Sequence, residues 1–312
     1  MLQAFNTIAP VFGLIVIGYL LSRLGAFGKA VSEGLSGFVF TLGIPALLFS
    51  TMISVEFPGT SPWPLWGAYF GAVGCVWVLG WAIARFGFRR DPKVSALAGV
   101  GSAYANTMLM GLPMIFAVMG EQGAVPLFII LSVHLPFMTL FATMQLEWAE
   151  RDTPGVSSAL VMGVLKGLVR NPIMLGLAAG LAWRLAGLGL PAVPAKVLEM
   201  LSEASVPCAL LAMGCALNHY GIRGAGALAA VMTAIKLVVH PAMVWLLATY
   251  VFALPPSWTM VAVMFAAAPT GINTFIFAVR YNAAIGMVSG AIALGTMISI
   301  ATYSLALWGL GR

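Results

Sequence analysis

The sequence predicts an all-α integral membrane protein with ten transmembrane helices, arranged as two inverted repeats of five. Three observations support this prediction. Apolar stretches of about 20 residues, the length that crosses a bilayer core, recur along the whole chain. Charged residues occupy only 8% of the 312 positions, against roughly 25% in a soluble domain. Prolines also recur at one fixed offset between the two halves of the chain.

The composition excludes two other classes of protein. With 61% hydrophobic residues, the chain cannot cover a water-facing surface. The period-two alternation of an outer-membrane barrel is absent. A net charge of +6 would suggest nucleic acid as a partner of a soluble protein, but in a membrane protein Lys and Arg gather in cytoplasmic loops. We therefore expect lipid around this chain and no nucleic-acid partner.

Ten apolar segments are expected to span the membrane, with ends that are defined to within a few residues. They cover residues 5–22, 31–52, 64–86, 94–119, 123–146, 172–188, 198–217, 226–252, 257–279 and 284–310. The first is long enough to span and follows no basic segment, which favours a retained helix over a cleaved signal peptide.

A polar segment, residues 147–155, separates the two halves and is the most charged stretch of the chain. The amphipathic residues 156–170 follow it, with Lys166 and Arg170 on the polar side, and are predicted to form an interfacial helix. The expected units are a first repeat (1–146), a cytoplasmic linker with the interfacial helix (147–170) and a second repeat (171–312).

Basic residues predict the orientation of the chain. Eleven lie in the loops after odd-numbered spans: Arg23, Lys29, Arg85, Arg89, Arg90, Lys93, Arg151, Lys166, Arg170, Arg223 and Arg280. The opposite side holds only Arg184, Lys196 and Arg312. Because Lys and Arg collect on the cytoplasmic side, we expect a bacterial inner-membrane protein with both termini in the periplasm.

The two halves align through their prolines. Pro10 and Pro172 are 162 residues apart, and so are Pro45 and Pro207. Five spans is an odd number, so the second half enters the membrane from the opposite side, which is the inverted repeat of many secondary transporters. Chance alignment is the alternative, since prolines are frequent in membrane helices.

The fourth and ninth spans each hold Pro, Gly, Asn and Thr at their centre. Residues 104–113 read YANTMLMGLP, and residues 268–277 read APTGINTFIF. Proline and glycine weaken a helix, and the freed backbone groups are tolerated in a membrane only against protein or a watery cavity. Paired breaks in inverted halves indicate a midplane binding site whose half-helix N-termini suit a carboxylate. A kink that serves packing alone is the alternative for either helix taken singly.

These motifs resemble the auxin efflux carrier family, whose bacterial members include permeases for malonate and other organic acids. The resemblance covers the whole chain and rests on Asn106-Thr107, Gly111-Leu112-Pro113, residues 269–274 and residues 278–281. It implies that spans one, two, six and seven form a scaffold, that the others form a transport domain moving as an elevator, and that scaffolds pair into a homodimer. It further implies that the broken helices cross and that the substrate carboxylate is lined by Asn106, Gly111, Pro113, Pro269, Gly271, Asn273 and Thr274.

One position departs from the family pattern. Many relatives carry an acidic residue after the alanine that corresponds to Ala278, and this chain has Val279. Neither broken helix holds Asp or Glu, the usual ligands of a sodium site. The sequence therefore does not support sodium coupling, although a sodium-coupled carrier like the bile-acid symporters stays the alternative transporter. No metal or cofactor motif is apparent.

Ionisable residues inside spans are functional candidates by default, because burying them is expensive. Lys236 lies about ten residues into the eighth span, and His240 follows on the same helix face. We expect Lys236 to attract the anion in the transport cavity and His240 to exchange a proton. The alternative is a lysine that binds backbone carbonyls or the ends of the broken helices, much as a bound cation would.

Two further groups are weaker candidates for proton coupling or gating. His134 in the fifth span is expected to be buried and satisfied by a backbone carbonyl. Glu199 and Glu203, near the periplasmic entrance of the seventh span, are expected to bond across helices or face water, with Glu203 as a gate in the alternative.

The functional prediction is a secondary carrier of small organic anions, either malonate-like diacids or aromatic monoacids such as indole-acetate, with protons as a further coupling partner. A membrane enzyme would need a catalytic set at one face of the membrane, and none is present. A channel would show charge rings or a filter motif. A non-transporting sensor would carry an output domain, for which the linker is too short.

Overall fold

The structure is a computed structural model, and it describes residues 2–54, 59, 61–150, 162–163, 166–167, 169–220 and 226–310. Within these ranges the chain is helical, and the only strand-like feature is an isolated antiparallel bridge between Ala105 and Thr270.

Helices of the first half follow one another with short connections. In order they are α1 (Leu2–Arg23), α2 (Lys29–Phe38), η1 (Val39–Gly43), α3 (Ile44–Ser54), α4 (Trp63–Ala82), η2 (Ile83–Gly87), α5 (Pro92–Ala103), η3 (Thr107–Gly111), α6 (Leu112–Met119), η4 (Gly120–Gly123) and α7 (Ala124–Glu150). The segments η1, η2 and η3 are π-helical, and η4 is a 3₁₀ turn.

Helices of the second half begin after the linker. They are α9 (Pro172–Leu185), α10 (Ala192–Tyr220), α11 (Ala227–Ala234), η5 (Ile235–Val239), α12 (His240–Leu246), η6 (Leu247–Val251), α13 (Pro256–Ala267), α14 (Ile272–Arg280) and α15 (Ile285–Leu310). The segments η5 and η6 are π-helical.

Six helical stretches in the described part of the chain are long and apolar enough to cross a membrane. They are Lys29–Ser54, Trp63–Gly87, Thr107–Glu150, Ala192–Asn218, Ala227–Val251 and Ile285–Leu310. Three shorter apolar helices accompany them, at Ala9–Arg23, Pro172–Leu185 and Pro256–Ala267. The chain is therefore a multi-pass membrane protein.

Three helix ends differ from the predicted ones by three to six residues. The helix α7 continues to Glu150, so the first four residues of the predicted polar linker are helical. The helix α9 ends at Leu185 rather than Leu188, and α10 begins at Ala192 rather than Leu198. Most of the predicted interfacial helix, residues 156–170, lies outside the described residues.

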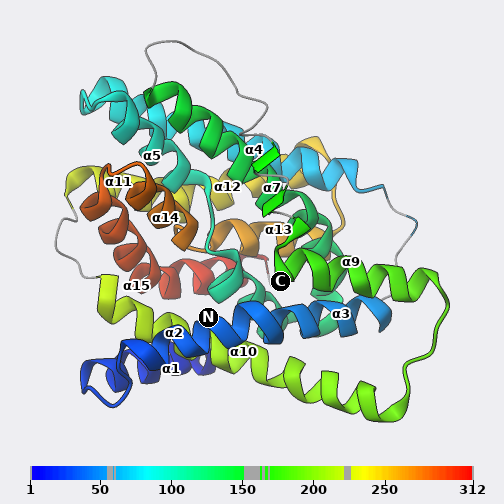
Figure 1. Ribbon diagram of the computed structural model, residues 1–312. Coiled ribbons are helices and arrows are strands. Elements are labelled where there is room, and N and C mark those ends of the chain that lie inside the picture. The colour runs from blue at the N-terminus through cyan, green and yellow to red at the C-terminus, as the bar shows by residue number, and fades with distance from the viewer. Residues whose placement is uncertain are drawn as a thin grey trace.

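The helices pack as two groups (Figure 1). In the α1 group, α1 packs on α10 and α3 packs on α9 and α10. In the α13 group, α4, α5, α7 and α11 to α15 pack on one another. The segments η3 and α6 lie between the groups, because each contacts both α10 and α13. The first broken span is therefore placed at the boundary of the groups, and the second lies within the α13 group.

Glycines bring the backbones of the α1 group close together. A Cβ at Gly18 would collide with the carbonyl oxygen of Leu211, and a Cβ at Gly214 would collide with that of Ile15. A Cβ at Gly176 of α9 would lie 2.7 Å from the carbonyl oxygen of Pro45 in α3. Small residues of this kind allow membrane helices to pack by close van der Waals contact.

Candidate functional site

The two broken spans meet where each is unwound. Ala105 and Thr270 form the antiparallel bridge. The backbone nitrogen of Asn106 donates to the Pro269 carbonyl at 2.7 Å, and that of Gly271 donates to the Tyr104 carbonyl at 2.8 Å. Backbone groups freed by one break are thus satisfied by the other, as the membrane interior requires. We call residues 104–106 and 269–271 the crossing.

The first break is organised by its own side chains. Asn106 precedes η3 and caps it, since its side-chain oxygen accepts from the Leu109 nitrogen at 3.4 Å. Pro113 occupies the first turn of α6, where proline's missing N–H is tolerated. The Gly111 nitrogen donates to the Asn106 carbonyl at 2.9 Å.

The second break depends on close backbone approach. The helix α13 ends at Ala267, and Gly271 precedes α14 without a side-chain cap. A Cβ at Gly271 would lie 2.7 Å from the Ala105 carbonyl oxygen, so this contact requires glycine. The first turn of α14 contains Asn273 and Thr274, and it directs free N–H groups and a positive dipole end toward the crossing.

Two polar side chains in that turn are available near the crossing. Asn273 is half-buried and interacts with the Tyr104 hydroxyl. Thr274 is fully buried, and its hydroxyl has no hydrogen-bond partner among the described residues. An unpartnered buried hydroxyl is a group that a bound ligand can satisfy.

The Lys236 side chain is fully buried and lies at the end of α13. Its Nζ donates to the Ala266 carbonyl and lies 3.1 Å from Nδ1 of His240, which is also fully buried. The last carbonyls of a helix lack intrahelical partners and attract a cation. The structure therefore places Lys236 at the end of a broken helix, as the structural alternative predicted, and places His240 beside it.

His134 was expected to bond a backbone carbonyl, and this was wrong. Its Nδ1 lies 3.2 Å from the hydroxyl of Tyr69, a residue on α4 for which the sequence offers no signal. The rings of Tyr69, Tyr104 and Phe265 surround the imidazole at centroid distances of 5.7, 5.4 and 5.2 Å. The Tyr69 ring also lies 5.8 Å from that of His240, so the two histidines belong to one buried cluster.

Glu203 does not belong to this cluster. It is exposed on α10 and lines a separate cavity of about 440 Å³ together with Glu121 and Glu199. Glu199 forms an exposed ion pair with Lys196 at 3.0 Å. Both Glu199 and Glu203 are exposed.

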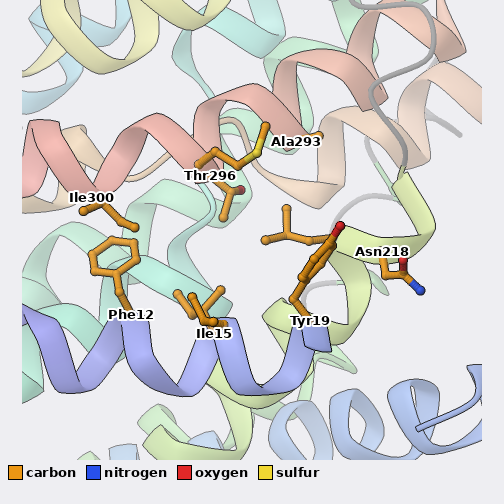
Figure 2. Close-up of a pocket in the computed structure, with 10 residues that line it drawn as sticks. Phe12, Ile15, Tyr19, Asn218, Ala293, Thr296 and Ile300 are labelled. Carbon is orange, nitrogen blue, oxygen red and sulfur yellow. The ribbon is translucent and has the colours of Figure 1, made fainter. Parts of the chain in front are cut away.

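A larger cavity of about 590 Å³ lies between α1, α10 and α15 (Figure 2). Its wall is mainly apolar, and its polar side chains are Tyr19, Asn218 and Thr296. Its lining residues are Phe12, Ile15, Val16, Tyr19, Leu217, Asn218, Ala293, Thr296, Met297 and Ile300. No charged residue lines it. In the described residues, no group of three His, Cys, Asp or Glu is placed to hold a metal ion.

Comparison with known proteins agrees with a transport role. The family model described as "Membrane transport protein" matches residues 3–308. A putative malonate transporter of Rhizobium meliloti is 27% identical over 97% of this chain and 94% of its own length. An uncharacterized transporter of Methanothermobacter thermautotrophicus is 25% identical over 98% of this chain and 97% of its own.

A plant protein matches a smaller part of the chain. Auxin efflux carrier component 1 of Arabidopsis thaliana is 32% identical over 47% of this chain and 25% of its own length. These relatives are named as transporters or carriers and not as enzymes.

Proposed function

The chain belongs to the membrane transport protein family that includes the auxin efflux carriers, and from this premise we propose that it carries small carboxylate anions across a bacterial inner membrane by alternating access. The substrate carboxylate binds at the crossing. The observation that carries this proposal is the antiparallel pairing of two broken helices, which brings the N-terminal turn of α14 and the Asn106, Asn273 and Thr274 side chains to one place.

The architecture in this proposal is ten spans in two inverted repeats of five. The α1 group is the scaffold and the α13 group is the transport domain, which moves as an elevator and carries the crossing with it. Support comes from the close glycine-mediated packing of the α1 group, which suits an immobile part, and from the position of η3 and α6 between the groups. Two scaffolds form the homodimer, and both termini face the periplasm.

The first turn of α14 supplies most of the binding energy in this mechanism. A carboxylate accepts hydrogen bonds from backbone N–H groups at a helix N-terminus, and the helix dipole stabilises its charge. The Asn273 amide and the Thr274 hydroxyl add side-chain donors beside it. Lys236 contributes positive potential from behind Ala266 without touching the substrate.

The driving ion in this proposal is the proton. His134 and His240 lie in one buried cluster next to Lys236, and each has an Nε2 atom without a partner in the described part of the chain. Glu203 is a weaker candidate for a functional role, and the role proposed for it is that of a periplasmic gate. The substrate is a malonate-like diacid, as the name of the Rhizobium meliloti relative suggests, or an aromatic monoacid, as the plant carriers suggest.

Uptake of labelled malonate and indole-acetate into proteoliposomes tests the proposal, with wild type and Asn273→Ala compared with and without a pH gradient and with and without sodium. Saturable uptake by wild type that Asn273→Ala abolishes is the expected result, and the gradient arms identify the ion. If both proteins transport either acid equally, the substrate does not bind at the crossing. If wild type moves neither acid under any gradient, the proposed substrate class is wrong.

A further inference from the structure

The Asn106 side chain has a weak partner for a group so deeply buried. Only 3% of the residue is exposed. Its oxygen is occupied by the Leu109 nitrogen, whereas its Nδ2 donates to the sulfur of Met213 at 3.3 Å. Within the described ranges, this thioether is the amide nitrogen's only hydrogen-bond partner.

A thioether is a poor acceptor, while a carboxylate is a strong one. An amide donor that faces sulfur inside a membrane therefore retains most of its capacity to bond a better acceptor. Since the crossing is the carboxylate site of the proposed function, the sulfur of Met213 occupies a place where a substrate oxygen would be favoured.

Met213 is close along α10 to residues that line the cavity of about 590 Å³. It precedes Leu217 by one helical turn on α10, and Leu217 lines the cavity. The neighbouring Gly214 lies against the backbone of Ile15, which lines the same cavity from α1 (Figure 2). Met213 itself is only 1% exposed, so the sulfur that contacts Asn106 is fully buried.

The contact also joins the two helix groups. Met213 belongs to the α1 group, and Asn106 lies on the broken span at the boundary with the α13 group. Methionine is unbranched, with three rotatable side-chain bonds, so it can swing aside without backbone movement. A sliding of one group past the other would also separate sulfur from amide.

We propose that Met213 is the gate of the crossing: its sulfur holds the Asn106 amide when no anion is bound, and an arriving carboxylate displaces it. This inference rests on the proposed function for the identity of the ligand. It assigns to Met213 a positioning role, because the residue acts on the substrate through competition for Asn106.

Two substitutions of similar size separate the gate from simple packing. Met213→Leu removes the acceptor, so labelled indole-acetate or malonate should bind to the purified protein about 2- to 10-fold more tightly. Met213→Gln offers Asn106 a stronger acceptor, so the same probe should bind more weakly by a similar factor. Met297→Leu is the matched control, because Met297 lines the cavity without contacting Asn106, and it should leave binding unchanged. Equal affinity in the Leu and Gln variants would overturn the proposal.

A second measurement needs no ligand. In a chain whose Cys75, Cys208 and Cys215 are replaced by alanine, Asn106→Cys is labelled with a small thiol reagent. The reagent should react several-fold faster when Met213→Ala is added, and Met297→Ala should have no such effect. An unchanged rate would show that Met213 covers nothing. If the rate rises while wild type binds neither acid, the gate stands and the proposed substrate class fails.

Discussion

Two breaks meet at the crossing, one between α5 and η3 and the other between α13 and α14. Their polar groups are bonded by residues from different parts of the sequence. In the first, the Asn106 side chain caps the helix that follows it. In the second, Gly271 offers no side chain, and a carbonyl at the end of α13 is satisfied by Lys236 from η5. The helix that follows the first break is therefore capped by its own residue, whereas the end of α13 depends on Lys236. The end of α5 depends in turn on Thr270 of the second break, whose hydroxyl donates to the Gly101 carbonyl at 2.8 Å. This difference teaches that two repeats can share a geometry while depending on different parts of the sequence.

The largest loss of folding stability should come from replacing Lys236, the distant partner of the second break. Lys236→Met leaves the Ala266 carbonyl and His240 Nδ1 without a donor, and each unpaired buried group costs about 1–3 kcal/mol. Lys236→Gln retains a donor and should lose less. Thermal unfolding of the purified protein in detergent measures both. A Lys236→Met variant as stable as wild type would mean that the second break needs no external partner.

The next largest loss of folding stability should come from replacing the glycine of the second break. Gly271→Ala should destabilise by about 1–3 kcal/mol, because its Cβ would be forced against the Ala105 carbonyl. Gly111→Ala is the matched control from the first break, where the nearest atom to an added Cβ lies 3.5 Å away, and it should be tolerated. Unfolding midpoints that fall equally in the two variants would contradict this contrast.

Removing the Asn106 cap should lower the folding stability by a smaller amount. Asn106→Ala removes the side-chain acceptor of the Leu109 nitrogen, which typically costs about 1 kcal/mol. Asn106→Ser keeps a capping oxygen and should retain most of the stability. The same unfolding assay ranks the three proteins, and a serine variant no more stable than the alanine variant would argue against capping as the role.

The smallest effect concerns the far end of α14. The Tyr281 hydroxyl donates to Glu147 of α7 at 2.9 Å, and burial together with this bond raises the pKa of Tyr281 from 10.0 to about 12. Because the neutral phenol is favoured in the folded protein, its contribution is complete below pH 10 and is lost as the pH rises to about 12. Tyr281→Phe should not lose stability over this pH range, because it has no phenol to ionise. At neutral pH it should be less stable than wild type by about 0.5–1.5 kcal/mol or less. Unfolding at pH 8 and pH 11 compares the two proteins.

Much of the fold followed from local pattern. Apolar length and the central Pro, Gly and Asn of the fourth and ninth spans predicted helices that are broken near Asn106 and Gly271, and the structure has both breaks. The end of α7 was predicted four residues too early because residues 147–150 contain two glutamates and were assigned to the polar linker, although glutamate is a good helix former.

The partners of the site residues were harder to predict. The i,i+4 spacing of Lys236 and His240 was enough to place them together. Nothing in the sequence connects Lys236 with Ala266, His134 with Tyr69, or Asn106 with Met213, because each pair joins different helices whose relative rotation depends on packing. Five π-helical segments in the described residues add to this difficulty, since each shifts the faces that follow it.

Two hydrogen bonds of the crossing join main-chain atoms only: two N–H groups and two carbonyls from residues 104–106 and 269–271. No side-chain replacement deletes those bonds, provided that position 271 stays small. The side chains around these bonds can therefore be exchanged while the junction is kept. A main-chain junction of this kind fixes how the two breaks meet and leaves the choice of cargo to the side chains that surround it.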